Sequence, residues 1–147
     1  MFPESSQKDY AGIMKHEYSC GAVVYRYNKT NYEYLLIRDR HGNFSFPKGH
    51  REEGESEKEC AIREIYEEVG IKITAFADFK ESSSYPLDED TIKHVTYFLA
   101  DSGDQQPFIN DGEVQEICFL AGDEALEKLT YDKARMVLSA AIRRLEG

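Results

Sequence analysis

Hydrophobic and polar residues alternate in several short runs that predict β-strands. Residues 19–27 and 32–38 are rich in β-branched and aromatic side chains, and the polar residues 28–31 between them predict a hairpin. Three later runs have the same character and are predicted strands: 72–80, 91–100 and 114–120. The polar segments between these elements are expected to be loops: 39–55, 81–90 and 101–111.

Residues 56–69 have the spacing of an amphipathic helix. Apolar residues three and four positions apart are expected to face the core, and these are Ala61, Ile62, Ile65, Tyr66 and Val69. Ser56, with Glu59 three residues later, predicts a capping box at the N-terminus. Gly70 is placed where a left-handed residue ends a helix. One face of this helix is therefore anchored in the core.

The opposite face carries Glu64, Glu67 and Glu68, which fall within roughly 100° of one another around the helix axis. Like charges at this spacing repel one another, so the array destabilises the helix unless a cation such as a divalent metal neutralises it. Arg63 can pair with Glu67, or with Glu55 in the preceding loop, and balance part of the charge. The alternative interpretation is an ordinary solvated helix surface, as most charge runs are.

Two further helices are expected towards the C-terminus. One is short, over residues 123–129, and the other is amphipathic, over 131–145, with Thr130 as its cap. Residues 1–15 are polar with weak periodicity and are expected to form a loosely ordered N-terminal arm, followed by a single domain over 16–147. The succession of strands, helix, strands and helix predicts an α/β fold.

Composition narrows the class of protein. The 147 residues, 41% hydrophobic and 31% charged, fit one soluble globular domain. The net charge of -10 argues against non-specific binding to duplex nucleic acid or to an anionic membrane. A polyphosphate ligand remains compatible, because a bound metal and a few basic residues can reverse the local field. With no apolar run near 18 residues and no signal-peptide pattern, the expected compartment is the cytoplasm.

The cysteines predict no disulfide framework. Cys20, Cys60 and Cys118 are odd in number and far apart, and no zinc-binding spacing is present. Buried free thiols are expected at all three positions.

The glutamate-bearing helix is part of a longer motif, Gly-x5-Glu-x7-Arg-Glu-Ile-x-Glu-Glu-x-Gly-Ile, which runs from Gly49 to Ile71. This spacing resembles the Nudix box without a departure, and the chain is therefore similar to the Nudix hydrolase family. The resemblance implies an α/β/α sandwich with a mixed sheet. It also implies hydrolysis of a nucleoside diphosphate linked to another moiety. The alternative is a non-catalytic nucleotide-sensing domain, although such domains usually lose box glutamates that this chain retains.

The resemblance also implies roles for box residues. The expected metal ligands are Glu64 and Glu68, with Glu67 in support. The backbone carbonyl of Lys48 and the neighbouring Gly49 complete the expected metal site. The expected ion is Mg²⁺, with Mn²⁺ as a substitute, because Mg²⁺ prefers oxygen ligands. Arg63 has an orienting role in catalysis with Glu67, while Glu55 and Gly70 are structural.

The general base stays open between two glutamates. Members of the family use either a box glutamate, here Glu64, or one from a later loop, here Glu113, just before the predicted strand 114–120. Glu116 is a rival to Glu113, and the alternative interpretation of Glu113 is an exposed loop acid.

Outside the box, several features resemble the asymmetrical diadenosine tetraphosphate hydrolases. The substrate-binding residues implied by this resemblance are Lys48, His50, Tyr85, Lys93 and Tyr131. The two tyrosines can stack on adenine, and the two lysines can contact phosphates. The expected reaction converts diadenosine tetraphosphate and water to ATP and AMP. For Tyr131, packing at the end of a helix is the alternative.

A second substrate class stays open. Tyr85 is closer to the box than is typical of dinucleoside polyphosphate enzymes, and Pro86 resembles a position in ADP-ribose pyrophosphatases. The alternative substrate is therefore ADP-ribose or another nucleotide, such as a nucleoside triphosphate or a capped RNA end. In each case the expected partner is a small nucleotide polyphosphate, bound by a monomer or a homodimer.

Overall fold

The computed structural model describes residues 14–147, which contain seven strands and three helices. In chain order the elements are β1 (Lys15–Tyr27), β2 (Tyr32–Arg38), β3 (Phe44–Ser45), β4 (Lys48–His50), α1 (Glu57–Val69), β5 (Glu81–Asp88), β6 (Thr91–Asp101), β7 (Glu116–Ala121), α2 (Gly122–Lys128) and α3 (Asp132–Glu146). The predicted N-terminal arm falls almost entirely on residues 1–13, outside the described part, and Lys15 already opens β1.

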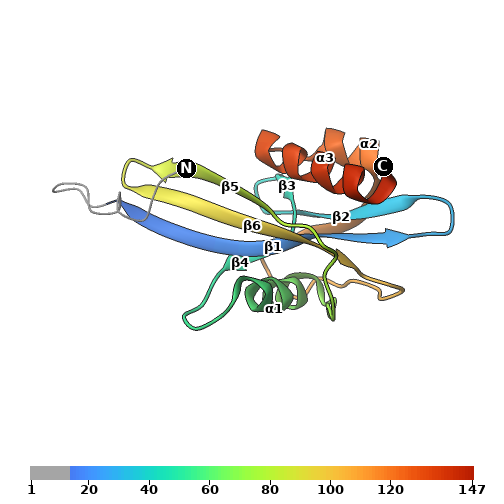
Figure 1. Ribbon diagram of the computed structural model, residues 1–147, viewed down its shortest axis with the longest axis horizontal. Helices are drawn as coiled ribbons and strands as arrows, with labels where there is room; N and C mark the ends of the chain where they lie inside the picture. The colour runs from blue at the N-terminus through green and yellow to red at the C-terminus, as the bar shows by residue number, and fades with distance from the viewer. Residues whose placement is uncertain (1–13) are drawn as a thin grey trace.

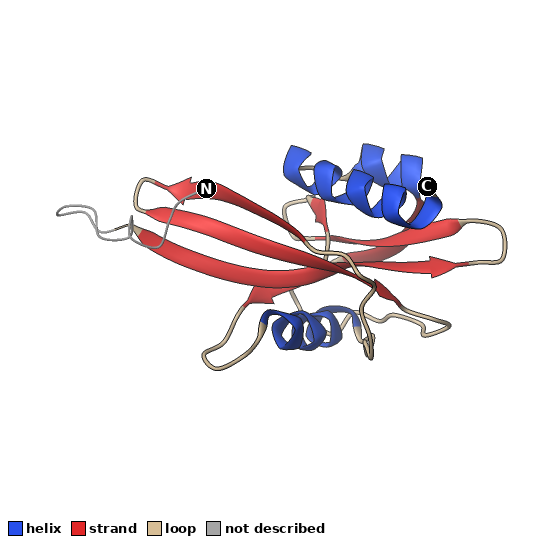
Figure 2. Cartoon of the chain, viewed as in Figure 1, coloured by secondary structure: helices blue, strands red, loops and turns tan. Residues whose placement is uncertain are grey.

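The strands form one mixed sheet between two helical layers (Figures 1 and 2). Their order is β3-β2-β1-β6-β5, with β4 paired to β1 and β7 paired to β2. The long pair β1 and β6 is parallel, and the other pairs are antiparallel, including the predicted β1–β2 hairpin. Helix α1 covers one face, and α2 and α3 cover the other. The α/β/α sandwich expected from the sequence is confirmed.

Each face of the sheet has its own apolar cluster. Side chains alternate along β1, so that Ala22 and Val24 pack in the cluster beneath α1, while Val23 packs in the cluster beneath α3. The buried residues of α1 are Cys60, Ala61, Ile65 and Val69. Because both faces are packed, the sheet fixes the position of α1 relative to the strands.

The ends of α1 are as the sequence predicts, but its apolar stripe is narrower. Ser56 and Glu59 form the reciprocal capping box, and Gly70 adopts the left-handed conformation with φ 73°. Ile62 and Tyr66, predicted to be buried, are 36% and 41% exposed. They are at the margin of the stripe, where the helix curves away from the sheet and meets solvent.

The elements directly after α1 differ from the prediction. Residues 72–80 are not a strand, because they cross from one face of the sheet to the other. Ile73 packs beneath α1, whereas Phe79 packs on the α3 side. Residues 81–90, predicted to be a loop, contain β5, a polar strand at the edge of the sheet that pairs with β6 and, among residues 14–147, with no other strand. An edge strand with little burial needs no apolar alternation, so its sequence resembled a loop.

The C-terminal elements shift by a few residues from their predicted bounds. The last strand begins at Glu116 rather than Val114, although Val114 is buried. Thr130 does not cap α3; its hydroxyl accepts the N–H of Phe44, and α3 begins after Tyr131 without a side-chain cap. This contact ties the start of α3 to β3.

All three cysteines are free thiols, as expected. Cys20 and Cys60 are buried, but Cys118 is only partly buried. The Sγ of Cys60 lies 3.5 Å from the carbonyl oxygen of Gly49, so this thiol joins α1 to β4. Burial raises the pKa of Cys20 to about 12, with the Cys60 thiol adding to the shift.

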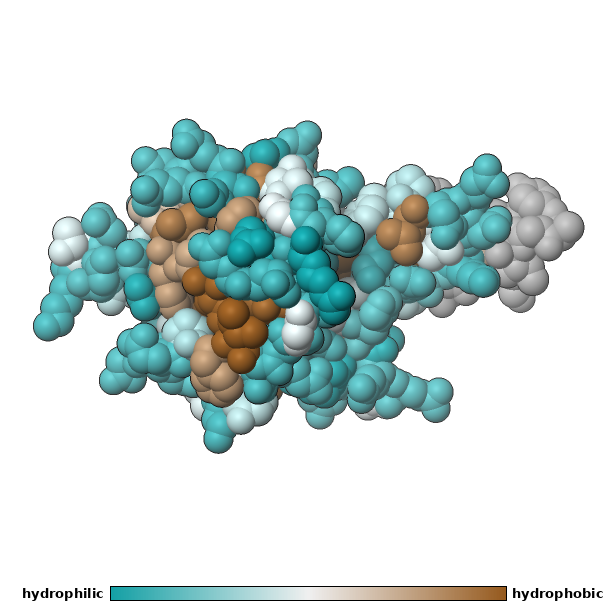
Figure 3. Space-filling model, turned by 180° about the vertical axis from the view of Figure 1, so that it is seen from behind, coloured by the Kyte–Doolittle hydropathy of each residue, from teal (hydrophilic) through white to brown (hydrophobic). Residues whose placement is uncertain are grey.

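The surface matches the charged composition. The face seen from behind in Figure 3 is hydrophilic over most of its area, and apolar side chains gather near its middle. Across residues 14–147, every helix is too short or too polar to cross a bilayer.

Gly70 gives a test of how α1 is joined to the loop after β6. Gly70→Ala forces alanine into a left-handed conformation, which costs about 1–2 kcal/mol, and drives the new methyl into the ring of Phe108. Gly42→Ala is the matched control, because Gly42 also has a positive φ but has open space around it. In urea unfolding, we expect Gly70→Ala to lose clearly more free energy of unfolding than Gly42→Ala. Equal losses would show that the Phe108 contact is unimportant.

Candidate active site

Strand β4 brings the chain against the carboxylate face of α1. Gly49 pairs with Cys20 in β1 and lies directly beside the carboxylate of Glu64. A Cβ added at Gly49 would collide with that carboxylate. The glycine therefore permits an approach that no other residue allows, and it places an acidic side chain against strand backbone.

Glu68 lies one turn further along α1 and faces the same strand. Its Oε1 accepts the backbone N–H of Lys48 at 3.2 Å. Burial, followed by the charge of Glu64, raises the pKa of the Glu68 carboxyl to about 8. Burial also raises the pKa of Glu64. Two acids held this close in a partly desolvated place favour a shared proton or a bound cation.

Arg63 holds the box together through one guanidinium group. It donates to Glu55 at 2.7 and 3.0 Å, to Glu64 at 2.8 Å, to Glu67 at 3.1 Å and to the carbonyl of His50 at 2.9 Å. The hydrogen bond from Arg63 lowers the pKa of Glu55 to about 2. Both partners that the sequence proposed for Arg63 are thus present. The network fixes the loop before α1 relative to the helix.

The donors at this site fit a hard divalent cation. They are carboxylate oxygens and strand backbone, the ligands that Mg²⁺ prefers, and burial followed by the charge of Glu64 raises the pKa of Glu68. Over residues 14–147, no three His, Cys, Asp or Glu side chains already converge as a metal group. One oxygen of Glu64 is turned towards Arg63 instead. Among residues 14–147, no protein group donates a hydrogen bond to the other carboxylate oxygen of Glu64 or of Glu68, so these two atoms are best suited to an ion.

The loop after β6 is bonded to the C-terminal end of α1. The N–H of Phe108 donates to the carbonyl of Val69 at 2.9 Å, and that of Asn110 donates to the carbonyl of Glu68 at 3.2 Å. These bonds satisfy carbonyls that a helix end leaves without partners. The residues that follow Asn110 are therefore delivered next to the box.

The acid of this loop that acts on the box carboxylates is Asp111. Its charge contributes to the raised pKa values of both Glu64 and Glu68. Glu113, the loop acid proposed from the sequence, is exposed and pairs with Arg40 at 2.5 Å. Sequence reasoning missed Asp111, because only the attachment of the loop to α1 brings it near the box.

A pocket of about 480 Å³ lies between the edge of the sheet and the start of α3. Lys48, Tyr85 and Tyr131 all line it, so three of the proposed substrate residues come together. Tyr131 is 50% exposed, which argues against a purely packing role. Burial raises the pKa of Tyr85, and the neighbouring Tyr131 adds to the shift. The two phenol rings are thus close enough to act on one ligand.

Two more residues relate this pocket to the carboxylates. Tyr97 is buried and lines the pocket, and Glu68 contributes to its raised pKa after burial and Tyr85. The sequence assigned Tyr97 no site role. Lys93 does not line the pocket, but its charge contributes, after burial, to the lowered pKa of Lys48. The Nζ of Lys93 lies 3.8 Å from a carboxylate oxygen of Glu17. Lys93 is therefore near Lys48, but its ion pair holds it away from the pocket.

His50 is the exception among the proposed substrate residues. It is exposed and lines a separate hollow, which shares no lining residue with the tyrosine pocket. The structure therefore does not bring His50 together with Tyr85 and Tyr131.

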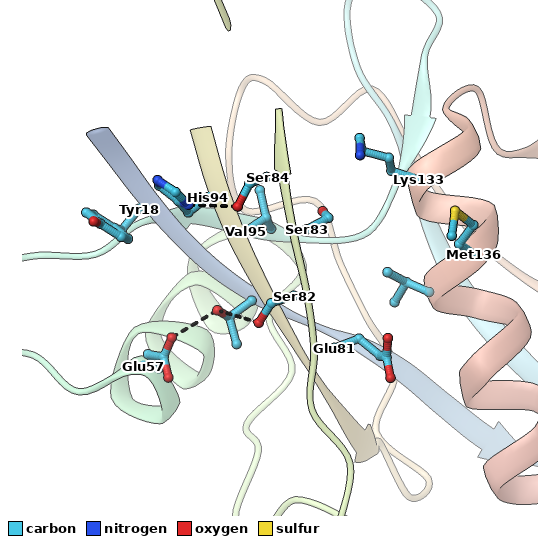
Figure 4. Close-up of a pocket in the computed structure, with 12 residues that line it drawn as sticks. Tyr18, Glu57, Glu81, Ser82, Ser83, Ser84, His94, Val95, Lys133 and Met136 are labelled. Carbon is cyan, nitrogen blue, oxygen red and sulfur yellow. Dashed lines mark hydrogen bonds between the residues drawn. The ribbon is translucent and has the colours of Figure 1, made fainter. Parts of the chain in front are cut away.

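A larger hollow of about 850 Å³ runs along β5 and is drawn in Figure 4. Ser82, Ser83 and Ser84 line it, and Glu57 is the acid of α1 that reaches it. None of the three box glutamates of the carboxylate face is among its lining residues. Size alone does not make this hollow the site of chemistry.

Comparisons with known proteins agree with this geometry. Residues 15–140 match the family profile of the NUDIX domain. The chain is 31% identical over 132 residues to an asymmetrical bis(5'-nucleosyl)-tetraphosphatase of Sus scrofa, covering 82% of this chain and 89% of that protein. It is 37% identical over 113 residues to an 8-oxo-(d)GTP phosphatase of Mycolicibacterium smegmatis, covering 75% of this chain but only 33% of that protein.

A solved structure gives the same picture. The binary complex of a C. elegans Ap4A hydrolase superposes with a TM-score of 0.81 at 27% identity, covering 89% of this chain and 98% of that one. With the box intact and its carboxylates gathered beside β4, the chain belongs to the Nudix family of pyrophosphohydrolases.

Proposed function

We propose that this protein hydrolyses dinucleoside polyphosphates, converting diadenosine tetraphosphate and water to ATP and AMP with Mg²⁺. The observation that carries the proposal is the pocket shared by Tyr85, Tyr131 and Lys48, because Lys48 immediately precedes Gly49, against which the Glu64 carboxylate lies. The similarity to the Sus scrofa tetraphosphatase supports the choice of substrate.

Different residues bind the base and the phosphates. The rings of Tyr85 and Tyr131 accept an adenine by stacking, which suits any flat base. The ammonium of Lys48, at the carboxylate end of the pocket, attracts the phosphates, and Lys93 adds charge nearby. The base is thus held at one end, and the phosphate chain is directed towards Glu64.

Nudix hydrolases generally use divalent metal ions. Glu64 and Glu68, supported by Glu67 and the Lys48 carbonyl, would hold such an ion here, and Mn²⁺ would serve in place of Mg²⁺. A bound ion neutralises phosphate charge and lowers the pKa of water. Arg63 keeps Glu64 oriented by its 2.8 Å hydrogen bond.

The reaction requires a base near the water. The water oxygen forms a new bond to phosphorus, the anhydride oxygen leaves with its electron pair, and the water proton passes to a carboxylate. Glu64 and Glu113 are the proposed bases. For Glu113 to act, its side chain must leave Arg40, with which it pairs at 2.5 Å. Asp111 joins them as a third acid of the site.

The second candidate is hydrolysis of a smaller nucleotide, such as a nucleoside triphosphate, ADP-ribose or a capped RNA end. The 37% identity to the 8-oxo-(d)GTP phosphatase favours keeping it. A non-catalytic sensor is disfavoured because every box glutamate is present. A cytoplasmic location and a monomeric or homodimeric state remain predictions.

A substrate panel tests the proposal directly. We expect diadenosine tetraphosphate, with Mg²⁺, to give ATP and AMP with a higher kcat/KM than ADP-ribose, 8-oxo-dGTP or ATP, with products resolved by ion-exchange chromatography. Chelation of the metal should abolish turnover, and Mn²⁺ should restore it. Fastest turnover of ADP-ribose or of a nucleoside triphosphate would transfer the assignment to the second candidate.

Amide substitutions identify the base. At least one of Glu64→Gln and Glu113→Gln should lower kcat by a factor of about 10²–10⁴, because general-base catalysis contributes that much. Asp111→Asn should mainly raise the metal concentration required for half-maximal activity. Glu124→Gln, at an exposed position of α2, is the matched control. Turnover near wild type in both Glu64→Gln and Glu113→Gln would contradict the mechanism.

The raised pKa of Glu68 predicts a pH-dependent stability. Without metal, the folded protein binds the Glu68 proton up to about pH 8, whereas the unfolded chain releases it near the ordinary value of 4.5. This contribution is therefore fully present below pH 4.5 and is lost as the pH rises through about 8. Urea unfolding in a chelator should show stability falling over this range, and Glu68→Gln should flatten the fall.

Magnesium gives the complementary measurement. An ion replaces the proton between the carboxylates, so saturating Mg²⁺ should stabilise the wild type more at pH 8 than at pH 5.5. Glu127→Gln, on the exposed side of α2, should behave as the wild type in both conditions. Identical pH slopes for the wild type and Glu68→Gln would contradict the burial argument.

A further inference from the structure

A second hollow, of about 520 Å³, lies between the first residues of β1 and the loop that follows β4. Tyr18 lines one side, and His50 and Arg51 line the other. Its volume is within the range of small-molecule sites. Of the residues that line this hollow, only His50 was expected to bind substrate, and His50 does not line the tyrosine pocket.

The ring of Tyr18 is a fixed and partly exposed platform. It is 39% exposed, and it stacks on His94 with centroids 4.8 Å apart and planes 13° apart. His94 stacks in turn on His16 at 5.0 Å and shares a 2.8 Å hydrogen bond with Ser84 (Figure 4). The stack spans β1, β6 and β5, so the Tyr18 ring is held in place by three strands.

Arg51 lies over this ring without closing on it. Its Cζ is 5.8 Å from the Tyr18 centroid, whereas the packed pair of Arg26 and Phe119 is at 3.9 Å. The Arg51 guanidinium makes no hydrogen bond or ion pair within residues 14–147, and the residue is exposed. An aromatic ring with a loosely placed guanidinium above it is suited to a flat, uncharged group such as a nucleobase.

The charged side chains that line the hollow favour an uncharged base over a phosphate group. Glu17, Glu52 and Glu53 line it, and their carboxylates repel an anion. A polyphosphate is therefore disfavoured inside the hollow, while a neutral base is accepted. The Arg51 guanidinium is the local counter-charge and stacks on π-systems.

Strand β4 connects the hollow to the active site. Its three consecutive residues are Lys48, which lines the tyrosine pocket, Gly49, which lies against Glu64, and His50, which lines the hollow. In an extended strand, the first and third of these lie roughly 7 Å apart. The two hollows therefore meet β4 at its two ends, with Gly49 and the Glu64 carboxylate between them.

We propose that Tyr18 and Arg51 form a second nucleobase site, which holds the far base of a dinucleoside polyphosphate while Tyr85 and Tyr131 hold the near one. This inference rests on the proposed dinucleoside polyphosphate activity and adds the residues that distinguish a two-base substrate from a one-base substrate.

The test compares diadenosine tetraphosphate with adenosine 5'-tetraphosphate, which lacks the second nucleoside. For the wild type, kcat/KM should be higher for the two-base substrate. In Tyr18→Leu and in Arg51→Met, the ratio of the two kcat/KM values should fall roughly tenfold, the scale of one base stacked on an aromatic ring. Tyr18→Phe keeps the ring and should keep the ratio.

Two comparison variants sharpen the result. Tyr85→Leu removes part of the near-base site and should lower kcat/KM for both substrates together, leaving their ratio unchanged. Tyr27→Leu, at an exposed tyrosine near the β1–β2 turn, should change neither value. Arg51→Met decides the question if Tyr18→Leu does not fold, because Arg51 is exposed.

The outcomes separate this inference from the proposed function. A wild type that hydrolyses neither tetraphosphate overturns the proposed function itself. A wild type that hydrolyses both, with a ratio that Tyr18→Leu and Arg51→Met leave unchanged, overturns only the second base site. A selective fall of the ratio in both variants, with thermal unfolding near that of the wild type, supports it.

Discussion

The structure is organised around two partly buried acids that lie against a strand. Glu64 and Glu68 reach β4 because Gly49 has no side chain and because the apolar face of α1 is packed on the sheet. Burial, and then the charge of Glu64, raises the pKa of the Glu68 carboxyl to about 8. This arrangement fits the metal site that the proposed function requires.

The surrounding contacts fix the box around these two acids. Arg63 makes two hydrogen bonds to Glu55 and reaches Glu64 with one of its nitrogens, and within residues 14–147 none of its hydrogen bonds goes to Glu68. The capping box fixes the start of α1, and the loop after β6 closes its end. The box is thus rigid at both ends, which lets a ligand meet preformed geometry.

Most of the site could be predicted from residues that are close together in the sequence. The features that were missed depend on contacts between residues that are far apart in the sequence. The box, its caps and the acids of α1 are set by residues a few positions apart, so they were predictable. The edge strand β5 was read as a loop because its pairing with β6 decides its structure. Asp111 and Tyr97 entered the site only through tertiary contacts, while Tyr85 and Tyr131 came from family resemblance.

The net negative charge of the chain affects how a polyphosphate can bind. With a net charge of -10, the protein repels a polyphosphate unless local cations intervene, and burial and Lys93 both lower the pKa of Lys48. In the proposed function, one lysine supplies a single positive charge against several phosphate charges. A cation held by the carboxylates would supply the remainder, and metal and polyphosphate would then bind cooperatively, each removing the repulsion that opposes the other.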